Sequence, residues 1–84
     1  MSIFIVEKTN DFIRIFSKIK HETLRERVIK QTEKIIANPE IGKPMRNVRK
    51  GTREVYVAPF RLSYLYLKEE NKILFLDLYH KDGQ

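Results

Sequence analysis

The spacing of the apolar residues changes once along the chain, from the helical repeat of about 3.6 residues to the strand repeat of 2. Up to residue 37, two stripes recur at helical spacing: Phe12, Ile15, Phe16 and Ile19, then Leu24, Val28, Ile35 and Ile36. After residue 52, apolar and polar residues alternate in three short runs. Two helices followed by three strands predict an α+β fold.

The first half of the chain is expected to hold one strand, two helices and a loop. The apolar run at residues 2–6 predicts a strand buried on both faces. N-cap residues at 9–11 precede a helix that ends near residue 20, and Thr23 with Glu26 forms a capping box for a second helix to about residue 37. Their short link predicts an antiparallel helical hairpin. Proline and glycine make residues 38–50 a loop, with 45–48 as a candidate extended piece.

The second half is expected to form a meander of three antiparallel strands at residues 53–58, 61–67 and 73–79. Tight turns at Pro59 and at residues 69–71 join them. The N-terminal strand can add to this sheet while the helical hairpin packs on one face, so the order is β-α-α-β-β-β in a single domain, residues 1–84. On the last strand we expect Leu74, Leu76 and Leu78 to face the core and Ile73, Phe75, Asp77 and Tyr79 to face away.

The positive charge is concentrated in one segment. The chain has 17 Lys and Arg against 11 Asp and Glu, a net charge of +6. Between residues 43 and 61 the basic residues are Lys43, Arg46, Arg49, Lys50, Arg53 and Arg61, and the acidic residue is Glu54. Such a block repels itself unless an anion lies across it, which favours a nucleic-acid partner over a merely solvated loop.

Several function classes are excluded by composition. The absence of cysteine leaves no thiolate nucleophile, disulfide or Cys-type zinc site, and two distant histidines do not make a metal centre. We therefore expect no metal and no cofactor. The sequence has neither a membrane-spanning run nor a signal peptide, so a cytoplasmic protein without a membrane partner is expected.

An ordered set of short motifs resembles the RelE/ParE toxin superfamily of toxin-antitoxin systems over essentially the whole chain. These motifs are Gly42-Lys43-Pro44, Lys50-Gly51, the strand 53–57, the turn and strand 59–64, and Tyr79-His80-Lys81-Asp82. The resemblance implies a sheet with a helical hairpin and a cognate antitoxin that binds and neutralises the toxin in a hetero-oligomer. In RelE-like members it further implies cleavage of mRNA on the ribosome, which inhibits translation.

The resemblance also assigns roles to individual residues. Arg61 matches the family's phosphate-binding arginine, although an ion pair with Glu54 or Asp77 is the structural alternative. Lys81 matches a basic residue close to the leaving oxygen. His80 is a candidate acid or base because its side chain ordinarily titrates near neutrality, and a solvated strand-end histidine is the alternative.

The chain also departs from the RelE pattern. Glu54 and Tyr56 stand where lysines are expected, so Glu54, Tyr56 and His80 form the alternative acid-base set, and the general base stays open. No C-terminal helix supplies a stacking tyrosine, so base stacking falls to Tyr79, with Tyr56 as a second candidate. The expected RNA-binding residues are thus Lys43, Arg46, Arg49, Lys50, Arg53 and Tyr79.

Three functions follow in order of preference. The first is a ribosome-dependent mRNA endonuclease that needs no metal and uses the RNA 2′-OH as nucleophile, with the antitoxin, the ribosome and mRNA as partners. The second is a ParE-like inhibitor of DNA gyrase. The third is a non-catalytic module that binds nucleic acid or an antitoxin.

Overall fold

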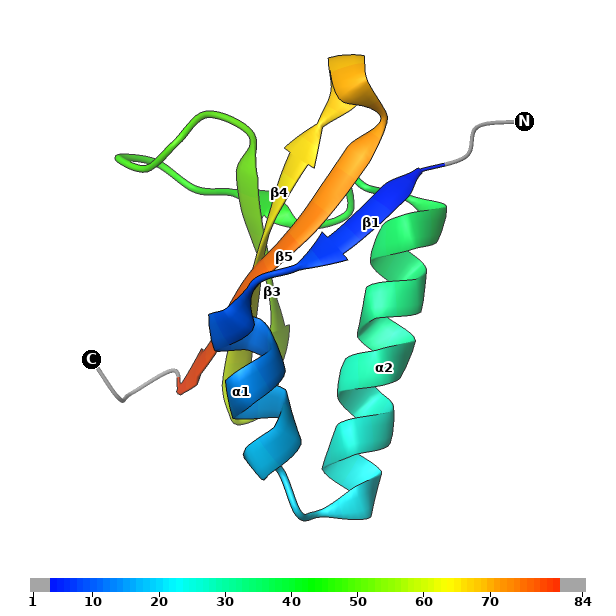
Figure 1. Ribbon diagram of the computed structural model, residues 1–84. Helices are drawn as coiled ribbons and strands as arrows, with labels where there is room; N and C mark the ends of the chain where they lie inside the picture. The colour runs from blue at the N-terminus through cyan, green and yellow to red at the C-terminus, as the bar shows by residue number, and fades with distance from the viewer. Residues whose placement is uncertain (1–3, 81–84) are drawn as a thin grey trace.

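The computed structural model describes residues 4–80 and shows a five-stranded sheet with two helices on one face (Figure 1). The strands are β1 (Ile5–Lys8), β2 (Lys43–Pro44), β3 (Thr52–Val57), β4 (Phe60–Leu67) and β5 (Lys72–His80), and the helices are α1 (Asn10–Lys18) and α2 (Glu22–Ala37). The sheet order is β1-β5-β4-β3-β2. β1 is parallel to β5 and the other neighbours are antiparallel. The predicted α+β fold with a helical hairpin is confirmed.

The start of α1 is fixed by the predicted cap. Thr9 Oγ1 accepts a hydrogen bond from the Phe12 amide at 3.0 Å and donates one to the Leu76 carbonyl at 2.6 Å. One side chain therefore caps the helix and ties it to β5. The predicted Thr23–Glu26 capping box is wrong, because α2 begins at Glu22 and Thr23 already lies in its first turn. The residue before the helix is His21, whose side chain makes no capping hydrogen bond.

Arg25 of α2 bonds to the end of α1, where the helical hairpin closes. Its Nη1 donates to the carbonyls of Phe16 and Ile19, at 3.3 and 3.1 Å, and its guanidinium lies 4.6 Å from the centre of the Phe16 ring. Arg25 thus satisfies carbonyl groups that the end of α1 leaves open. α1 ends at Lys18, slightly earlier than expected.

The core lies between the helices and the sheet, and both predicted helical stripes contribute to it. Its fully buried members include Val28, Ile35, Leu62, Tyr64, Ile73, Phe75 and Leu78. On β5 the predicted core face is wrong for two of three positions, since Ile73 and Phe75 are buried there and Leu74 and Leu76 are not. The cause is a break in register: Ser63 pairs with Asp77 and Tyr64 with Phe75, so Leu76 is an extra residue that reverses the alternation.

The N-terminal strand is not buried on both faces as expected. β1 is an edge strand whose four residues are exposed, including Ile5 at 55%. Of the predicted strand, residues 2 and 3 lie outside the described residues. The short extended piece of the long loop is also displaced, because β2 forms at Lys43–Pro44 and not at 45–48. No helix in the described part of the chain is long and apolar enough to cross a membrane.

Candidate functional site

Three polar side chains meet on the sheet face opposite the helices. Glu54 of β3, Arg61 of β4 and Tyr79 of β5 lie on neighbouring strands, and Arg61 is directly opposite Tyr79 in the ladder. Arg61 Nη1 donates to Glu54 Oε1 at 2.7 Å, and the Tyr79 hydroxyl donates to Glu54 Oε2 at 2.5 Å. Each oxygen of one carboxylate thus has its own donor. The ion-pair alternative for Arg61 is present, and its partner is Glu54.

Tyr79 is held in its protonated form within this cluster. Partial burial, followed by the hydrogen bond and the negative charge of Glu54, raises the pKa of Tyr79 to about 12, although Arg61 acts in the opposite direction. At neutral pH the phenol therefore carries its proton, as an unperturbed tyrosine also does, and the raised pKa makes it a weaker acid. Sequence reasoning assigned Tyr79 to base stacking, whereas its hydroxyl lies in the polar cluster.

A second carboxylate, Asp77, lies one pair along the ladder, opposite Ser63. Its Oδ1 is buried and has no hydrogen-bond partner within residues 4–80. Its charge contributes to the raised pKa of Tyr79. Sequence reasoning considered Asp77 only as an ion-pair partner of Arg61. The signal that could have drawn attention to it is a single acidic residue in the otherwise apolar run from Ile73 to Leu78.

Basic residues of the long loop border the cluster on one side. Lys43 pairs with Glu54 across β2 and β3. Lys43, Arg46 and Glu54 line a shallow hollow of about 350 Å³. An anion in this hollow would meet two cations beside the carboxylate.

The remaining basic residues of the segment do not join that hollow. Arg53 Nη1 donates to the carbonyls of Glu40 and Gly42, at 3.0 and 2.7 Å, so its guanidinium ties the long loop to β3. Lys50 lines a separate hollow with Arg53, and Arg49 is exposed on the loop. RNA binding by Arg49, Lys50 and Arg53 stays a prediction.

Of the other candidate acid-base residues, His80 is separated from the cluster, whereas Tyr56 lies beside Arg61 on the same face of the sheet. His80 is next to Tyr79 but on the opposite side of the strand, where its ring packs edge-on against Phe60 at 5.0 Å between centroids. Tyr56 is the ladder partner of Arg61 at the edge of β3 and is 55% exposed. Lys81 lies outside the described residues. No three His, Cys, Asp or Glu side chains within residues 4–80 are placed to hold a metal ion.

The comparisons with known proteins agree with this architecture. A family model described as the ParE toxin of type II toxin-antitoxin systems, parDE, matches residues 6–84. No curated protein sequence matches the chain. Among solved structures, the intact Escherichia coli RelBE toxin-antitoxin complex matches with a TM-score of 0.80 at 15% identity, over 95% of this chain and 99% of the other.

Two further structures give the same result. A RelBE toxin-antitoxin complex from Mycobacterium tuberculosis matches with a TM-score of 0.77 at 22% identity, over 93% of this chain and 98% of the other. A YoeB/ParE toxin from Agrobacterium tumefaciens matches with a TM-score of 0.80 at 11% identity, over 92% and 98%. At these identities the likenesses establish a shared fold. The family model spans nearly the whole sequence, and the chain therefore belongs to the ParE toxin family of type II toxin-antitoxin systems, within the RelE/ParE superfamily.

Proposed function

We propose that this toxin is a ribosome-dependent mRNA endonuclease that its antitoxin keeps inactive. The observation that carries the proposal is the cluster of Glu54, Arg61 and Tyr79 on the exposed sheet face, beside the hollow that Lys43 and Arg46 line. The cluster supports the proposal because it places a carboxylate, a guanidinium and a phenol, groups that can serve in RNA cleavage, within hydrogen-bond distance of one another.

The three side chains match the steps of RNA cleavage by the neighbouring 2′-OH. Glu54 takes the proton of the 2′-OH as the O2′–P bond forms, and Arg61 stabilises the pentavalent phosphate. Tyr79 gives its proton to the 5′-oxygen as the P–O5′ bond breaks. The products are a 2′,3′-cyclic phosphate and a 5′-hydroxyl end.

The hydrogen bonds of the cluster support this division of roles. Within residues 4–80 Arg61 bonds to Glu54 through Nη1, and the other N–H groups of its planar guanidinium can bind a phosphate. Glu54 and Tyr79 share a hydrogen bond of 2.5 Å, so the proton that Glu54 accepts can return directly to Tyr79 after cleavage. In this mechanism His80 and Lys81 are not required for the first proton transfer.

The partners follow from the family and from the charge. Solved structures that share the fold include toxin-antitoxin complexes, which supports a cognate antitoxin bound to this chain in a hetero-oligomer. The ribosome and its mRNA supply the polyanionic substrate that a protein of net charge +6 would approach readily. The expected place of action is the cytoplasm.

The test is to map mRNA 5′ ends in a translating extract to which the purified toxin is added. Cuts should appear with ribosomes and be absent from ribosome-free mRNA. Arg61→Ala and Glu54→Gln should each lower the cleavage rate by about 100-fold or more, the usual range for removing a transition-state donor or a general base. Lys18→Ala removes one positive charge from α1, as Arg61→Ala does from β4, and should cut normally.

A second candidate is inhibition of DNA gyrase, which the match to the ParE family model favours. A supercoiling assay with purified gyrase distinguishes the two functions. Gyrase inhibition without any mRNA cuts would overturn the nuclease proposal, and the cluster would then be a structural ion pair. If the toxin neither cut mRNA nor inhibited gyrase, a non-catalytic binding module would be the remaining interpretation.

A further inference from the structure

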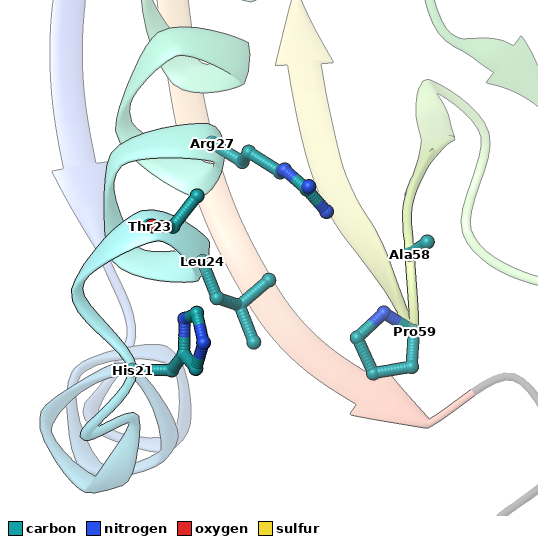
Figure 2. Close-up of a pocket in the computed structure, with 6 residues that line it drawn as sticks. All are labelled: His21, Thr23, Leu24, Arg27, Ala58 and Pro59. Atoms are coloured by element: carbon teal, nitrogen blue, oxygen red, sulfur yellow. The ribbon is translucent and has the colours of Figure 1, made fainter.

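A groove runs between α2 and the edge of β3 and continues to the hairpin between β3 and β4. It consists of two adjoining hollows of about 280 and 310 Å³ that share Arg27 and Ala58. Figure 2 shows the second hollow, with Arg27 extending from α2 toward Ala58 and Pro59 and with Leu24 below it. β2 pairs with Arg53 and Glu54, and in the part of the chain that the structure describes no strand pairs with residues 55–57 on that side, so the groove is open at this edge of β3.

The lining of this groove is basic. Arg27, Lys30 and Lys34 of α2 face it, together with Tyr56 from β3, and no acidic residue of the described range 4–80 lines either hollow. The three cations are spaced at i, i+3 and i+7, so they form one row that extends about 10 Å along the helix axis. Of the acidic residues of α2, Glu26 and Glu33 flank this row, four residues before Lys30 and three after it, whereas neither hollow is lined by Glu22, Glu26 or Glu33.

The three cations are available to a ligand. Arg27, Lys30 and Lys34 are exposed and form no ion pair within residues 4–80. By contrast, Arg25 on the same helix is committed to the carbonyls of α1 and to the Phe16 ring. A row of exposed cations along a groove attracts an extended anion laid along it.

We propose that this groove binds the phosphate backbone of single-stranded RNA, as a site additional to the one on the open sheet face. Continuity favours RNA over an acidic peptide: Tyr56 lines the groove and is also the ladder partner of Arg61, so a strand leaving Arg61 can pass around the edge of β3 into the groove. The exposed Tyr56 ring offers a surface on which a base can stack at this crossing. The path of the RNA from Arg61 into the groove rests on the proposed function. Binding of RNA in the groove does not itself require cleavage.

The test measures the affinity of the full chain for a fluorescent single-stranded 2′-O-methyl RNA, which has no 2′-OH to attack and so reports binding alone. The groove variant is Arg27→Ala/Lys30→Ala/Lys34→Ala, and the control Arg14→Ala/Lys18→Ala/Lys20→Ala removes the same charge from α1 and the interhelical link. At low salt we expect the groove variant to bind about tenfold more weakly or worse, and the control to bind nearly as the parent does. The slope of log K against log salt should become shallower by roughly 2 in the groove variant, because each of the three lost phosphate contacts contributes ~0.7 on a single strand.

Three results would overturn the proposal. The first is an equal loss of RNA affinity in the groove variant and the control. The second is unchanged RNA affinity in the groove variant. The third is a groove variant that loses affinity for a poly-glutamate peptide but not for RNA. The last result would assign the groove to an acidic peptide. The single variant Lys30→Glu, at an exposed helical position, repeats the test if the triple variant proves unstable by circular dichroism. RNA binding in the groove without mRNA cuts would contradict the proposed endonuclease and support this site. Cleavage of mRNA without RNA binding in the groove would support the endonuclease and contradict this site.

Discussion

At the scale of single residues, the phenol of Tyr79 ties the candidate chemistry to a measurable property of the fold. The unfolded chain releases this proton near pH 10.0, whereas burial and Glu54 raise the pKa of Tyr79 to about 12 in the native state. Between these values the native protein keeps a proton that the unfolded chain has lost. The contribution of Tyr79 to stability is therefore complete below about pH 10 and is lost as the pH rises toward about 12.

We predict that Tyr79→Phe lowers the free energy of unfolding at neutral pH, by about 1.5–3 kcal/mol for the lost hydrogen bond to a charged carboxylate. The difference between the parent and the variant should then shrink as the pH rises from about 10 to about 12. Urea denaturation at a series of alkaline pH values measures both effects. Glu54→Gln should weaken the pH dependence of the parent, because it removes a negative charge that keeps Tyr79 protonated. Parallel curves for the parent and Tyr79→Phe would show that the phenol is not held by this cluster.

The sequence identified the members of the cluster more readily than their arrangement. Glu54 and Arg61 were both predicted as site residues, and their positions on adjacent strands follow from a two-residue turn. Alternation along the last strand correctly placed Tyr79 on the face away from the core, and it puts the neighbouring His80 on the other side. The extra residue at Leu76 instead changed the outcome for Ile73 and Phe75, which are buried in the core. A register break is set by the packing of three strands together, so a single strand pattern cannot reveal it.

At the scale of elements, the start of the long loop is fastened to the sheet through a buried phenol. The Tyr64 hydroxyl accepts from the Gly42 amide at 2.9 Å and donates to the Pro39 carbonyl at 2.8 Å. Arg53 adds its two bonds to the carbonyls of Glu40 and Gly42. These bonds place β2, and with it Lys43, beside Glu54. A stretch that appeared in the sequence as a proline- and glycine-containing loop is thus held in one conformation.

We predict that Gly42→Ala destabilises the protein by about 1–3 kcal/mol, the usual cost of overpacking a core. A Cβ at this position would lie 2.5 Å from the Tyr64 hydroxyl oxygen and 2.8 Å from Cε1, and the fully buried ring has no room to move. Chemical denaturation measures the effect. Glu40→Ala removes an exposed side chain from the same loop and should change stability by less than about 0.5 kcal/mol.

A double-mutant cycle tests whether this clash is the cause. Tyr64→Phe alone leaves the Gly42 amide and the Pro39 carbonyl without their partner and should cost about 1–3 kcal/mol. Adding Gly42→Ala to Tyr64→Phe should cost less than Gly42→Ala does in the parent, because the nearest clashing atom is gone. Strictly additive costs would mean that the glycine is required for another reason.

The elements themselves were predicted where one local signal decides the outcome. Thr9 capped its helix as expected because its hydroxyl has a backbone donor three residues away. β1 was misjudged because an apolar run such as Ile3-Phe4-Ile5-Val6 indicates burial only if another element covers it, and β1 lies at the edge of the sheet. The capping box at Thr23 failed because α2 starts before it. Errors of this kind concern position in the sheet and the exact start of a helix, which are tertiary properties.

At the scale of the whole molecule, the net charge of +6 is divided among separate surfaces and does not form one patch. Lys43 and Arg46 border the cluster on the open face, whereas Arg27, Lys30 and Lys34 line the groove beside α2 on the helix side. Between the two surfaces lies the edge of β3, where Tyr56 stands. A long RNA could therefore contact both surfaces at once.

Because the basic residues near the cluster are distinct from the three proposed catalytic side chains, substituting them should affect the association rate more than the cleavage rate. Lys43→Gln/Arg46→Gln should slow association of the toxin with ribosomes and reduce its dependence on salt, because cations near the site steer an anionic partner. Cleavage at saturating toxin should change by less than about threefold, since Glu54, Arg61 and Tyr79 remain. Rapid mixing under single-turnover conditions separates the two quantities, and Lys18→Gln/Lys20→Gln serves as the control for net charge. An equal slowing in the control would assign the effect to total charge. A large fall in the rate at saturation would instead place Lys43 or Arg46 in contact with the reacting phosphate.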